Sequence, residues 1–345
     1  MKVVFTICSN NYLSHAQLML DTLNKHNPDY NRYIILCDEF DKRINYQELS
    51  CFKIIYWKEI IGELSSELVS KYDIVELNTS IKASAFKYLF NKVQNTEHII
   101  YLDPDIQVFD ELSAVEEAFL NQDILLTPHF LKPVPIDEKS PMENLALNYG
   151  LYNLGFIGLK GGSSIVLAFL DWWEERLLKK CFIDLNNGYF VDQLWVNMVT
   201  ILFERVFILR NYGLNVAPWN LHEREIISYE NGKYKMSDRG NLVFFHFSSF
   251  KFDENDLMSP YYNRITFENA NLYQKKIYTD YAQNLIQYNA AFYSSILCAY
   301  FKHSAPQKVP AQWKKFLFSI IPPLILSMYY NSKMFLLRNI RIIKS

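Results

Sequence analysis

Residues 99–106, IIYLDPDI, hold the pattern that decides the fold of this chain. Four apolar residues are followed at once by two aspartates, Asp103 and Asp105, which a single proline separates. A short, continuous apolar run is typical of a strand that is buried on both faces, as in a parallel sheet covered by helices. We therefore expect a buried strand at residues 99–102 with two carboxylates at its carboxyl end.

Similar apolar runs occur along the chain and alternate with helical patterns. We expect further strands at residues 3–8, 33–37, 51–57, 123–127, 148–160 and 242–247. We expect helices at residues 12–25, 81–93, 112–120, 163–180 and 191–203. Such alternation implies helical crossovers between parallel strands. The predicted class is α/β, a Rossmann-like, mixed but mostly parallel sheet flanked by helices. No GxGxxG motif follows the first strand, so we do not expect a dinucleotide cofactor.

The length of 345 residues exceeds what one core usually organises. We expect an α/β domain at residues 1–255 and a helical, basic and aromatic C-terminal region at residues 256–345. Five scattered cysteines without metal-ligand spacing argue against a disulfide framework or a structural zinc. The first apolar run is too short for a signal peptide. These features predict a cytoplasmic protein, at the inner face of the membrane if the C-terminal region binds lipid.

Charge is distributed unevenly along the chain, with an excess of basic residues in the C-terminal region. From Tyr281 to Ser345 the chain has eight Lys and Arg residues and no acidic residue. Basic residues interleaved with aromatic ones are typical of a peripheral membrane contact, although a helical cap docked on the domain explains them equally well. The apolar stretch at residues 316–330 is shorter than the ~20 residues of a spanning helix. Confinement of the basic excess to this region argues against nucleic-acid binding.

Asp103 and Asp105 lie where open α/β sheets bind their ligands, at the carboxyl end of a strand. In an extended or turning backbone, residues two apart point the same way, so both carboxylates can face one site. Two hard oxygen ligands suit Mg²⁺ or Mn²⁺ with positions left open for phosphate. The alternative is a capped turn in which the aspartates bond to backbone amides.

Five segments together resemble one enzyme family. IIYLDPDIQVF, residues 99–109, is similar to the signature of GT-A-fold glycosyltransferases, especially family eight, the glycogenin and lipopolysaccharide galactosyltransferase group, and related bacterial polysaccharide enzymes. Four other segments follow that family's order: FTICSNNYLSHAQLML at 5–20, YNLGFIGLK at 152–160, VDQLWVN at 191–197 and FFHFSSFK at 244–251. The resemblance covers nearly three quarters of the chain.

The resemblance implies a metal site. Asp103, Asp105 and His246 would hold Mn²⁺ or Mg²⁺ against the diphosphate of a nucleotide-sugar, and Lys251 would add a second cation there. A histidine that leaves a buried strand is a plausible neutral imidazole ligand. Taken alone, His246 reads better as a satisfied core histidine, and Lys251 as an exposed lysine.

The resemblance also implies contacts to the donor. Ile7, Asn10 and Tyr12 would hold the nucleobase, and Asn153 would bond to the donor sugar. Gly155 would allow a close approach of the backbone, or mark a strand bulge. Asp103 would contact the donor as well as the metal. Of the two lysines on the helix before the aspartates, Lys82 and Lys87, we favour Lys87 as the donor contact.

Asp192 and Gln193 are the implied catalytic residues. Gln193 would lie near the anomeric carbon of a reaction that retains configuration, and Asp192 is also a good helix N-cap. Within VAPWNLHER, residues 216–224, Trp219 and Asn220 would face the acceptor. Two departures stand out: Cys8 and Ser9 replace acidic residues that often read the base, and Ser249 replaces a usual glycine.

These observations predict a metal-dependent, retaining glycosyltransferase. It would move a hexosyl unit from a nucleotide-diphosphate sugar, most simply a UDP-sugar, to an oligosaccharide or lipid-linked glycan in bacterial surface polysaccharide synthesis. One alternative is a catalytically inactive protein that binds nucleotide-sugars or glycans. Another is a phosphatase of the haloacid dehalogenase type, which also uses Asp-x-Asp, but Gln107 stands where that family has Thr or Val.

Overall fold

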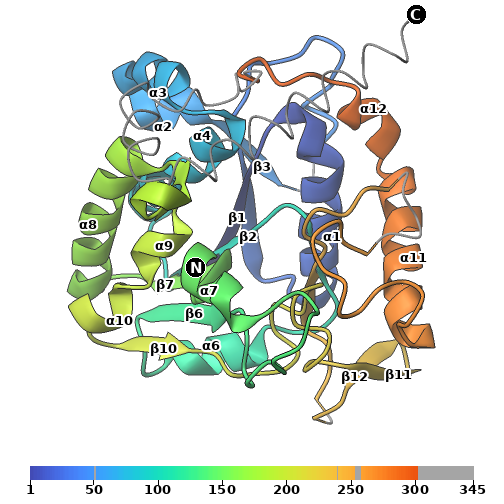
Figure 1. The fold of residues 1–345 in the computed structure, drawn as a ribbon. Coiled ribbons are helices and arrows are strands. Elements are labelled where there is room, and N and C mark those ends of the chain that lie inside the picture. The colour runs from blue at the N-terminus through green and yellow to red at the C-terminus, as the bar shows by residue number, and fades with distance from the viewer. Residues whose placement is uncertain (50–51, 239, 253–257, 302–345) are drawn as a thin grey trace, which may run out of the picture. The chain divides into compact units, whose positions relative to one another are not determined.

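A seven-stranded mixed sheet with strand order β10-β6-β7-β4-β1-β2-β3 forms the centre of the molecule (Figure 1). β1 runs parallel to β2 and β4, and β7 runs antiparallel to both of its neighbours, β4 and β6. The expected α/β class is therefore confirmed. The strands of this sheet are β1 (Lys2–Cys8), β2 (Tyr30–Leu36), β3 (Lys53–Tyr56), β4 (His98–Leu102), β6 (Ile124–Pro128), β7 (Tyr152–Lys160) and β10 (Val206–Ile208).

The computed structural model describes residues 1–49, 52–238, 240–252 and 258–301. Residues Met1–Phe301 form one compact unit, which extends beyond the domain boundary predicted at residue 255. The helices of this unit are α1 (Leu13–His26), α2 (Trp57–Ile61), α3 (Ser65–Lys71), α4 (Ile74–Ser80), α5 (Lys82–Lys92), α6 (Ser113–Phe119), α7 (Glu143–Tyr149), α8 (Ser164–Lys180), α9 (Gln193–Val196), α10 (Val199–Leu202), α11 (Leu272–Gln287) and α12 (Ala290–Ser294).

Helices cover both faces of the sheet because its strands are apolar on both sides. In β1, Phe5 and Ile7 belong to a core that includes residues of α5 and α8, whereas Val4 and Cys8 belong to a second core with α1 and α6. Successive side chains of a strand point to opposite faces, so one unbroken apolar run serves both layers. Figure 1 shows α8 and α1 on opposite sides of the sheet.

Three smaller strand pairs surround the main sheet: β5 (Ile106–Val108) with β13 (Phe244–His246), β8 (Ile183–Asp184) with β9 (Tyr189–Phe190), and β11 (Ile226–Glu230) with β12 (Lys233–Met236). The β5–β13 pair sets the position of His246. Helix α11 packs against a third core, in which the rings of Phe247 and Tyr281 stack with 3.6 Å between their centroids. Residues that follow the main sheet in sequence thereby hold β13 in place.

Several elements differ in detail from the expectation. The helix expected at 191–203 is broken into α9 and α10, and the strand expected at 148–160 begins only at Tyr152, because the preceding residues complete α7. The strand expected at 51–57 ends before Trp57, whose indole is buried as the first residue of α2. At residues 51–57 and 148–160 a short apolar run fits helix and strand alike, and packing decides between them.

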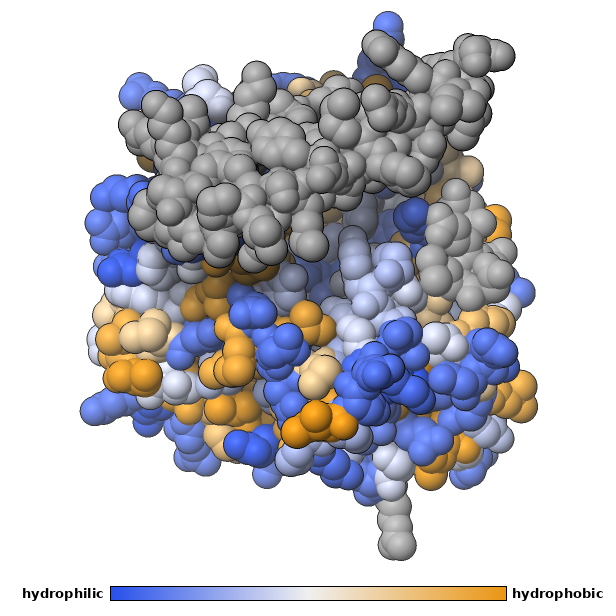
Figure 2. Space-filling model, in the orientation of Figure 1, coloured by the Kyte–Doolittle hydropathy of each residue, from blue (hydrophilic) through white to orange (hydrophobic). Residues whose placement is uncertain are grey.

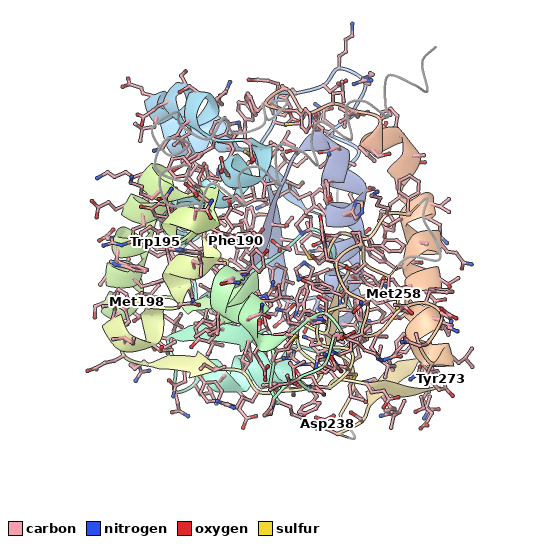
Figure 3. The ribbon with its side chains drawn as sticks, viewed as in Figure 1. Phe190, Trp195, Met198, Asp238, Met258 and Tyr273 are labelled. Carbon is pink, nitrogen blue, oxygen red and sulfur yellow. The ribbon has the colours of Figure 1, made fainter. Side chains whose placement is uncertain are left out.

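The described surface mixes polar and apolar side chains. On the coloured part of the face in Figure 2, hydrophilic and hydrophobic residues are interspersed. Figure 3 places Phe190, Trp195 and Met198 around α9 and α10, on the other side of the molecule from Tyr273 of α11. No helix within the described ranges has both the length and the apolar character needed to cross a bilayer. The basic tail, residues 302–345, lies outside the described residues.

Candidate active site

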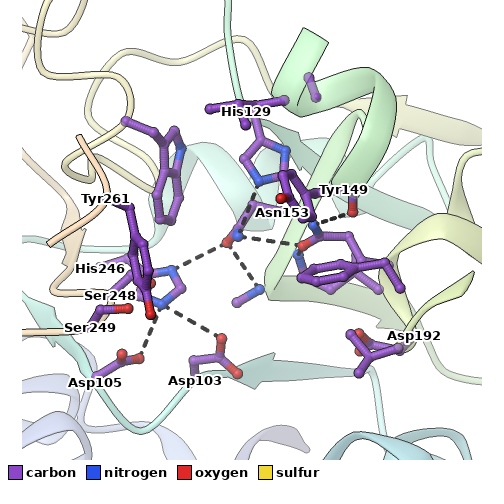
Figure 4. A pocket seen from close by; sticks show the side chains of 18 of the residues that line it. Asp103, Asp105, His129, Tyr149, Asn153, Asp192, His246, Ser248, Ser249 and Tyr261 are labelled. Carbon is purple, nitrogen blue, oxygen red and sulfur yellow. Dashed lines mark hydrogen bonds and ion pairs between the residues drawn. The ribbon is translucent and has the colours of Figure 1, made fainter. Parts of the chain in front are cut away.

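The two aspartates stand in a turn between β4 and β5, at the carboxyl end of the central strand. The amide of Asp103 donates to the carbonyl of Gly155 (2.9 Å), and the amide of Ile106 donates back to the carbonyl of Asp103 (3.2 Å). This turn aims both carboxylates into a cavity of about 750 Å³ (Figure 4). The hydroxyl of Tyr101, two residues earlier, donates to Asp103 Oδ1 (2.6 Å) and fixes that carboxylate.

His246 reaches the aspartates through strand pairing. In the antiparallel β5–β13 pair His246 lies opposite Ile106, and the amide of Phe247 donates to the carbonyl of Asp105 (2.9 Å). His246 Nε2 lies 3.1 Å from Asp105 Oδ1 and 3.6 Å from Asp103 Oδ2. One ligand atom from each of the three side chains lies within 4.8 Å of the others. The structure therefore brings together the three residues expected to ligate a metal.

The hydrogen bond on the far side of the imidazole sets its tautomer. Asn153 Oδ1 accepts from the amide of Gly155 (3.1 Å) and from Asn215 Nδ2 (3.0 Å), so it is an acceptor. It lies 3.2 Å from His246 Nδ1, which must then carry the proton. In neutral His246 this leaves Nε2 with its lone pair facing the two carboxylates, the arrangement that a metal ligand needs.

Gly155 explains why the histidine fits. A Cβ at Gly155 would lie 2.6 Å from both Cε1 and Nδ1 of His246 and 2.8 Å from Asn153 Oδ1. No real side chain tolerates such contacts, so the imidazole occupies the space that the missing side chain leaves. Gly155 was expected to let the backbone come close to a neighbouring group, and in the structure that group is the imidazole of His246.

The charges of the three groups depend on one another. Burial raises the pKa of Asp103, although Lys82 and His246 oppose this. Burial also acts to raise the pKa of Asp105, but the adjacent imidazole holds that pKa below its ordinary value. For His246 burial lowers the pKa and the two carboxylates raise it more, so the net shift is upward.

The donor set fits a divalent cation. Two carboxylates and one neutral imidazole suit Mn²⁺, and the oxygen ligands also suit Mg²⁺. Without a metal, the two carboxylates favour the protonated form of His246. A divalent cation bound to Nε2 would replace that proton.

Asp192 forms a buried ion pair with Lys82 of α5. Lys82 Nζ lies 2.5 Å from Asp192 Oδ2, and both side chains are almost fully buried. The same ammonium donates to the carbonyl of Leu154 (3.1 Å) and lies 4.1 Å from the ring centroid of Tyr101. The N-cap role considered for Asp192 is not observed, because its carboxylate makes no capping hydrogen bond.

Gln193 is held in the cavity wall next to Asn153. Its Nε2 donates to the carbonyl of Tyr149 (2.7 Å), and its Oε1 accepts from the amide of Leu154 (3.1 Å). Gly150, with φ of +128°, lies against it, and a Cβ there would be 2.6 Å from Gln193 Cγ. The side-chain amide is therefore fixed at the edge of the cavity.

The cavity collects most of the predicted site residues and leaves out five. Its lining includes Tyr12, Asp103, Asp105, Asn153, Gly155, Asp192, Gln193, Trp219 and His246. Ile7, Asn10, Lys87, Asn220 and Lys251 are not among the lining residues. Lys251 is exposed and follows Ser248 and Ser249, which do line the cavity.

Two of the excluded residues have their polar groups engaged within the protein. Asn220 is fully buried, and its amide bonds to the backbone of Ala217, Asn215 and His129. Asn10 is buried, and its side chain bonds to the carbonyl of Glu39 and the hydroxyl of Tyr46.

The structure places the two lysines of α5 differently from the expectation that favoured Lys87. Lys87 Nζ pairs with Glu174 (2.5 Å) and Asp171 (2.9 Å) of α8, on the face of α5 that packs against that helix. Lys82 lines the cavity. The two lysines are five positions apart, which places them on different faces of a helix with 3.6 residues per turn.

Sequence reasoning missed Tyr101 and Asn215, which orient Asp103 and Asn153. For Tyr101 a signal existed, because it lies two residues before Asp103 and so points to the same side of the strand. For Asn215 no local signal existed. Ser249 has φ of +62°, so the position where a glycine is usual does adopt the left-handed conformation that glycine favours.

Comparison with known proteins gives distant relatives. No protein-family model matches this chain. Two proteins of Bacillus subtilis (strain 168), both described as uncharacterised, are similar: YfnF, 25% identical over 71% of this chain and 80% of its own length, and YfnD, 22% identical over 81% and 87%.

Solved structures that resemble the chain include glycosyltransferases. The galactosyltransferase LgtC, solved in complex with donor and acceptor sugar analogs, is 14% identical, with a TM-score of 0.46 over 91% of this chain and 99% of that one. The glycosyltransferase GlyE of Streptococcus pneumoniae TIGR4 is 12% identical, with a TM-score of 0.45 over 86% of this chain and 65% of that one.

Proposed function

We propose that this protein is a metal-dependent glycosyltransferase that transfers a hexosyl unit from a nucleotide-diphosphate sugar, most simply a UDP-sugar, to a glycan. The observation that carries the proposal is the convergence of Asp103, Asp105 and His246 Nε2 on a large cavity at the carboxyl end of β4. Ligands of open α/β sheets bind at this edge.

Asp103, Asp105 and His246 would hold Mn²⁺ or Mg²⁺. The bound cation would neutralise the negative charge that develops on the departing diphosphate. In the transfer, an acceptor hydroxyl oxygen bonds to the anomeric carbon as the bond from that carbon to the diphosphate oxygen breaks. The hydroxyl proton leaves with the diphosphate, and configuration is retained when both events occur on one face of the sugar.

The remaining lining residues divide between donor and reaction centre. Tyr12, which follows β1 and is 40% exposed, would stack on the nucleobase. Asn153 and Gln193, both almost fully buried, present fixed amides to the sugar. The Lys82–Asp192 pair lies beside Tyr101 and Asp103, so it would place a carboxylate and a cation near the breaking bond.

The setting of the reaction is a further part of the proposal. We infer a cytoplasmic protein that acts in surface polysaccharide synthesis, with a lipid-linked glycan as acceptor. Support comes from the eight basic and no acidic residues among residues 302–345, which favour an anionic membrane surface. The nucleobase contacts of Ile7 and Asn10 and the phosphate contact of Lys251 stay predictions.

A thermal-shift screen tests the central proposal. UDP-glucose, UDP-galactose and UDP-N-acetylglucosamine are each added with and without Mn²⁺, and the melting temperature is measured, because a ligand of the folded state raises it. At least one donor should raise it only with Mn²⁺, and Asp105→Asn should abolish the shift. UDP release then distinguishes turnover from an inactive binding protein. Phosphate release from sugar phosphates without any nucleotide-sugar binding would instead favour the phosphatase alternative.

A further inference from the structure

A series of aromatic rings leads from the solvent to the candidate metal site. Tyr261 is 68% exposed and lines the mouth of the cavity. Its ring centroid lies 6.4 Å from that of Tyr262, which lies 6.5 Å from Trp219, which in turn lies 5.2 Å from the imidazole of His246. We call Tyr261, Tyr262 and Trp219 the ring track. Figure 4 shows Tyr261 on the same side of the pocket as His246 and Ser248.

The inner end of the ring track holds a donor without an acceptor. Trp219 is 4% exposed, and its indole N–H has no hydrogen-bond partner within the described residues. A buried indole N–H usually finds a partner, because leaving it unpaired costs free energy. The indole nitrogen itself is shielded from solvent, whereas Trp219 is part of the cavity's lining, so a ligand near the metal site would contact its ring.

The outer end is fixed by a buried arginine. Arg264 donates to both carboxylate oxygens of Asp137 (2.9 and 2.7 Å) and to the carbonyls of Lys139 (3.1 Å) and Pro141 (3.3 Å). In addition, the amides of Asn263 and Arg264 donate to the carbonyl of Ser140. These bonds join two chain segments across the cavity wall. Tyr261, an exposed aromatic residue in a loop, is thus attached to a rigid support.

The ring track lies away from the place of the nucleotide. Tyr12, Val75 and Thr79, which line the other part of the cavity, belong to the elements that follow β1 and precede α5. Trp219, Tyr261 and Tyr262 come from the C-terminal half of the unit and approach the metal site from the β13 side. A donor bound at the end of β1 leaves the ring track to the acceptor.

We propose that the ring track is an acceptor subsite for an oligosaccharide of at least two sugar units. This proposal rests on the proposed function. Trp219 contacts the reacting sugar through its ring, and Tyr261 stacks on the apolar face of a sugar further from the reaction centre. A single sugar reaches Trp219 alone, whereas a longer glycan also covers Tyr261. The enzyme therefore selects acceptors by length.

The experiment compares acceptors of increasing length in wild type and Tyr261→Ala. The probes are methyl glycosides of glucose, galactose and N-acetylglucosamine and the corresponding di- and trisaccharides, with the donor found in the thermal-shift screen. Wild type should have a lower KM for di- or trisaccharides than for monosaccharides. Tyr261→Ala should raise the KM for the longer acceptors by roughly three- to tenfold, the usual worth of one aromatic contact, and leave the monosaccharide KM unchanged.

Three controls separate this proposal from its alternatives. Tyr261→Phe keeps the ring and should behave as wild type. Tyr229→Ala removes another exposed tyrosine (43%), which lies on β11 and is not among the lining residues of the cavity. Mn²⁺-dependent UDP affinity and slow donor hydrolysis should be the same in all variants. If no variant, wild type included, binds a nucleotide-sugar, the proposed function fails. If the donor is bound but acceptor length has no effect, or if Tyr261→Ala weakens UDP binding, only the acceptor subsite is overturned.

Discussion

Gly155→Ala should separate metal binding from folding. The new Cβ would meet Cε1 and Nδ1 of His246 at 2.6 Å, and both are ring atoms held by the β5–β13 pair and by Asn153. Relieving the contact requires His246 to move, because Gly155 lies in β7, which pairs with a strand on each side. Overpacking of this kind costs about 1–3 kcal/mol of stability. Loss of the orienting bond to Asn153 should lower Mn²⁺ affinity roughly 10–100-fold.

Gly158→Ala is the matched control. It lies three residues further along β7, where a Cβ would meet Phe119 Cζ at 2.8 Å, far from the metal site. Isothermal titration with Mn²⁺ and UDP, together with urea unfolding, measures both properties. Both variants should be destabilised, and only Gly155→Ala should lose metal affinity. Unchanged Mn²⁺ affinity in Gly155→Ala would refute the assignment of His246 Nε2 as a ligand.

Other predictions concern His246 and residues near the candidate metal site formed by Asp103, Asp105 and His246. Lys82→Met leaves Asp192 buried without its partner and should lower the free energy of unfolding in urea by about 3–5 kcal/mol. The double variant Lys82→Met with Asp192→Leu should recover most of that stability. Neither variant should turn over the donor. Equal stability of the single and double variants would contradict this. Ser249→Gly relieves a φ of +62° and should raise the free energy of unfolding by about 1 kcal/mol, seen as a higher melting temperature; a lower one would be unexpected. In the metal-free protein the pKa of His246 is raised above its ordinary value of 6.5. Protonation of His246 therefore contributes fully to folding stability below pH 6.5, and this contribution is lost as the pH rises through the pKa of the folded state. Mn²⁺ affinity should therefore increase with pH through this window, and His246→Gln should flatten the dependence.

The sequence was most informative where the apolar pattern is unbroken. The runs at residues 3–8 and 99–102 predicted β1 and β4 to within one residue, because strands buried on both faces leave no freedom for polar substitution. Spacing alone placed Asp103 and Asp105 on one site. The candidate ligand His246 came from the resemblance, and the structure supplied its partner strand β5.

The sequence was least informative about side chains whose surroundings depend on distant partners. Asn220 and Asn10 are polar residues near the site in sequence, yet both bond to neighbouring backbone, which no local pattern reveals. Lys82 and Lys87 differ only in the face of α5 they occupy, and that face is settled by the packing of α5 against α8. Gly155 was expected to approach a ligand, but the group that approaches it is a histidine 91 residues later.

Anomalous diffraction from crystals grown with Mn²⁺ and UDP would locate the metal ion. We predict one manganese peak about 2.0–2.3 Å from Asp103, Asp105 and Nε2 of His246, with diphosphate oxygens completing the coordination. A manganese peak bound elsewhere, or a bound UDP whose diphosphate lies away from these three side chains, would contradict it.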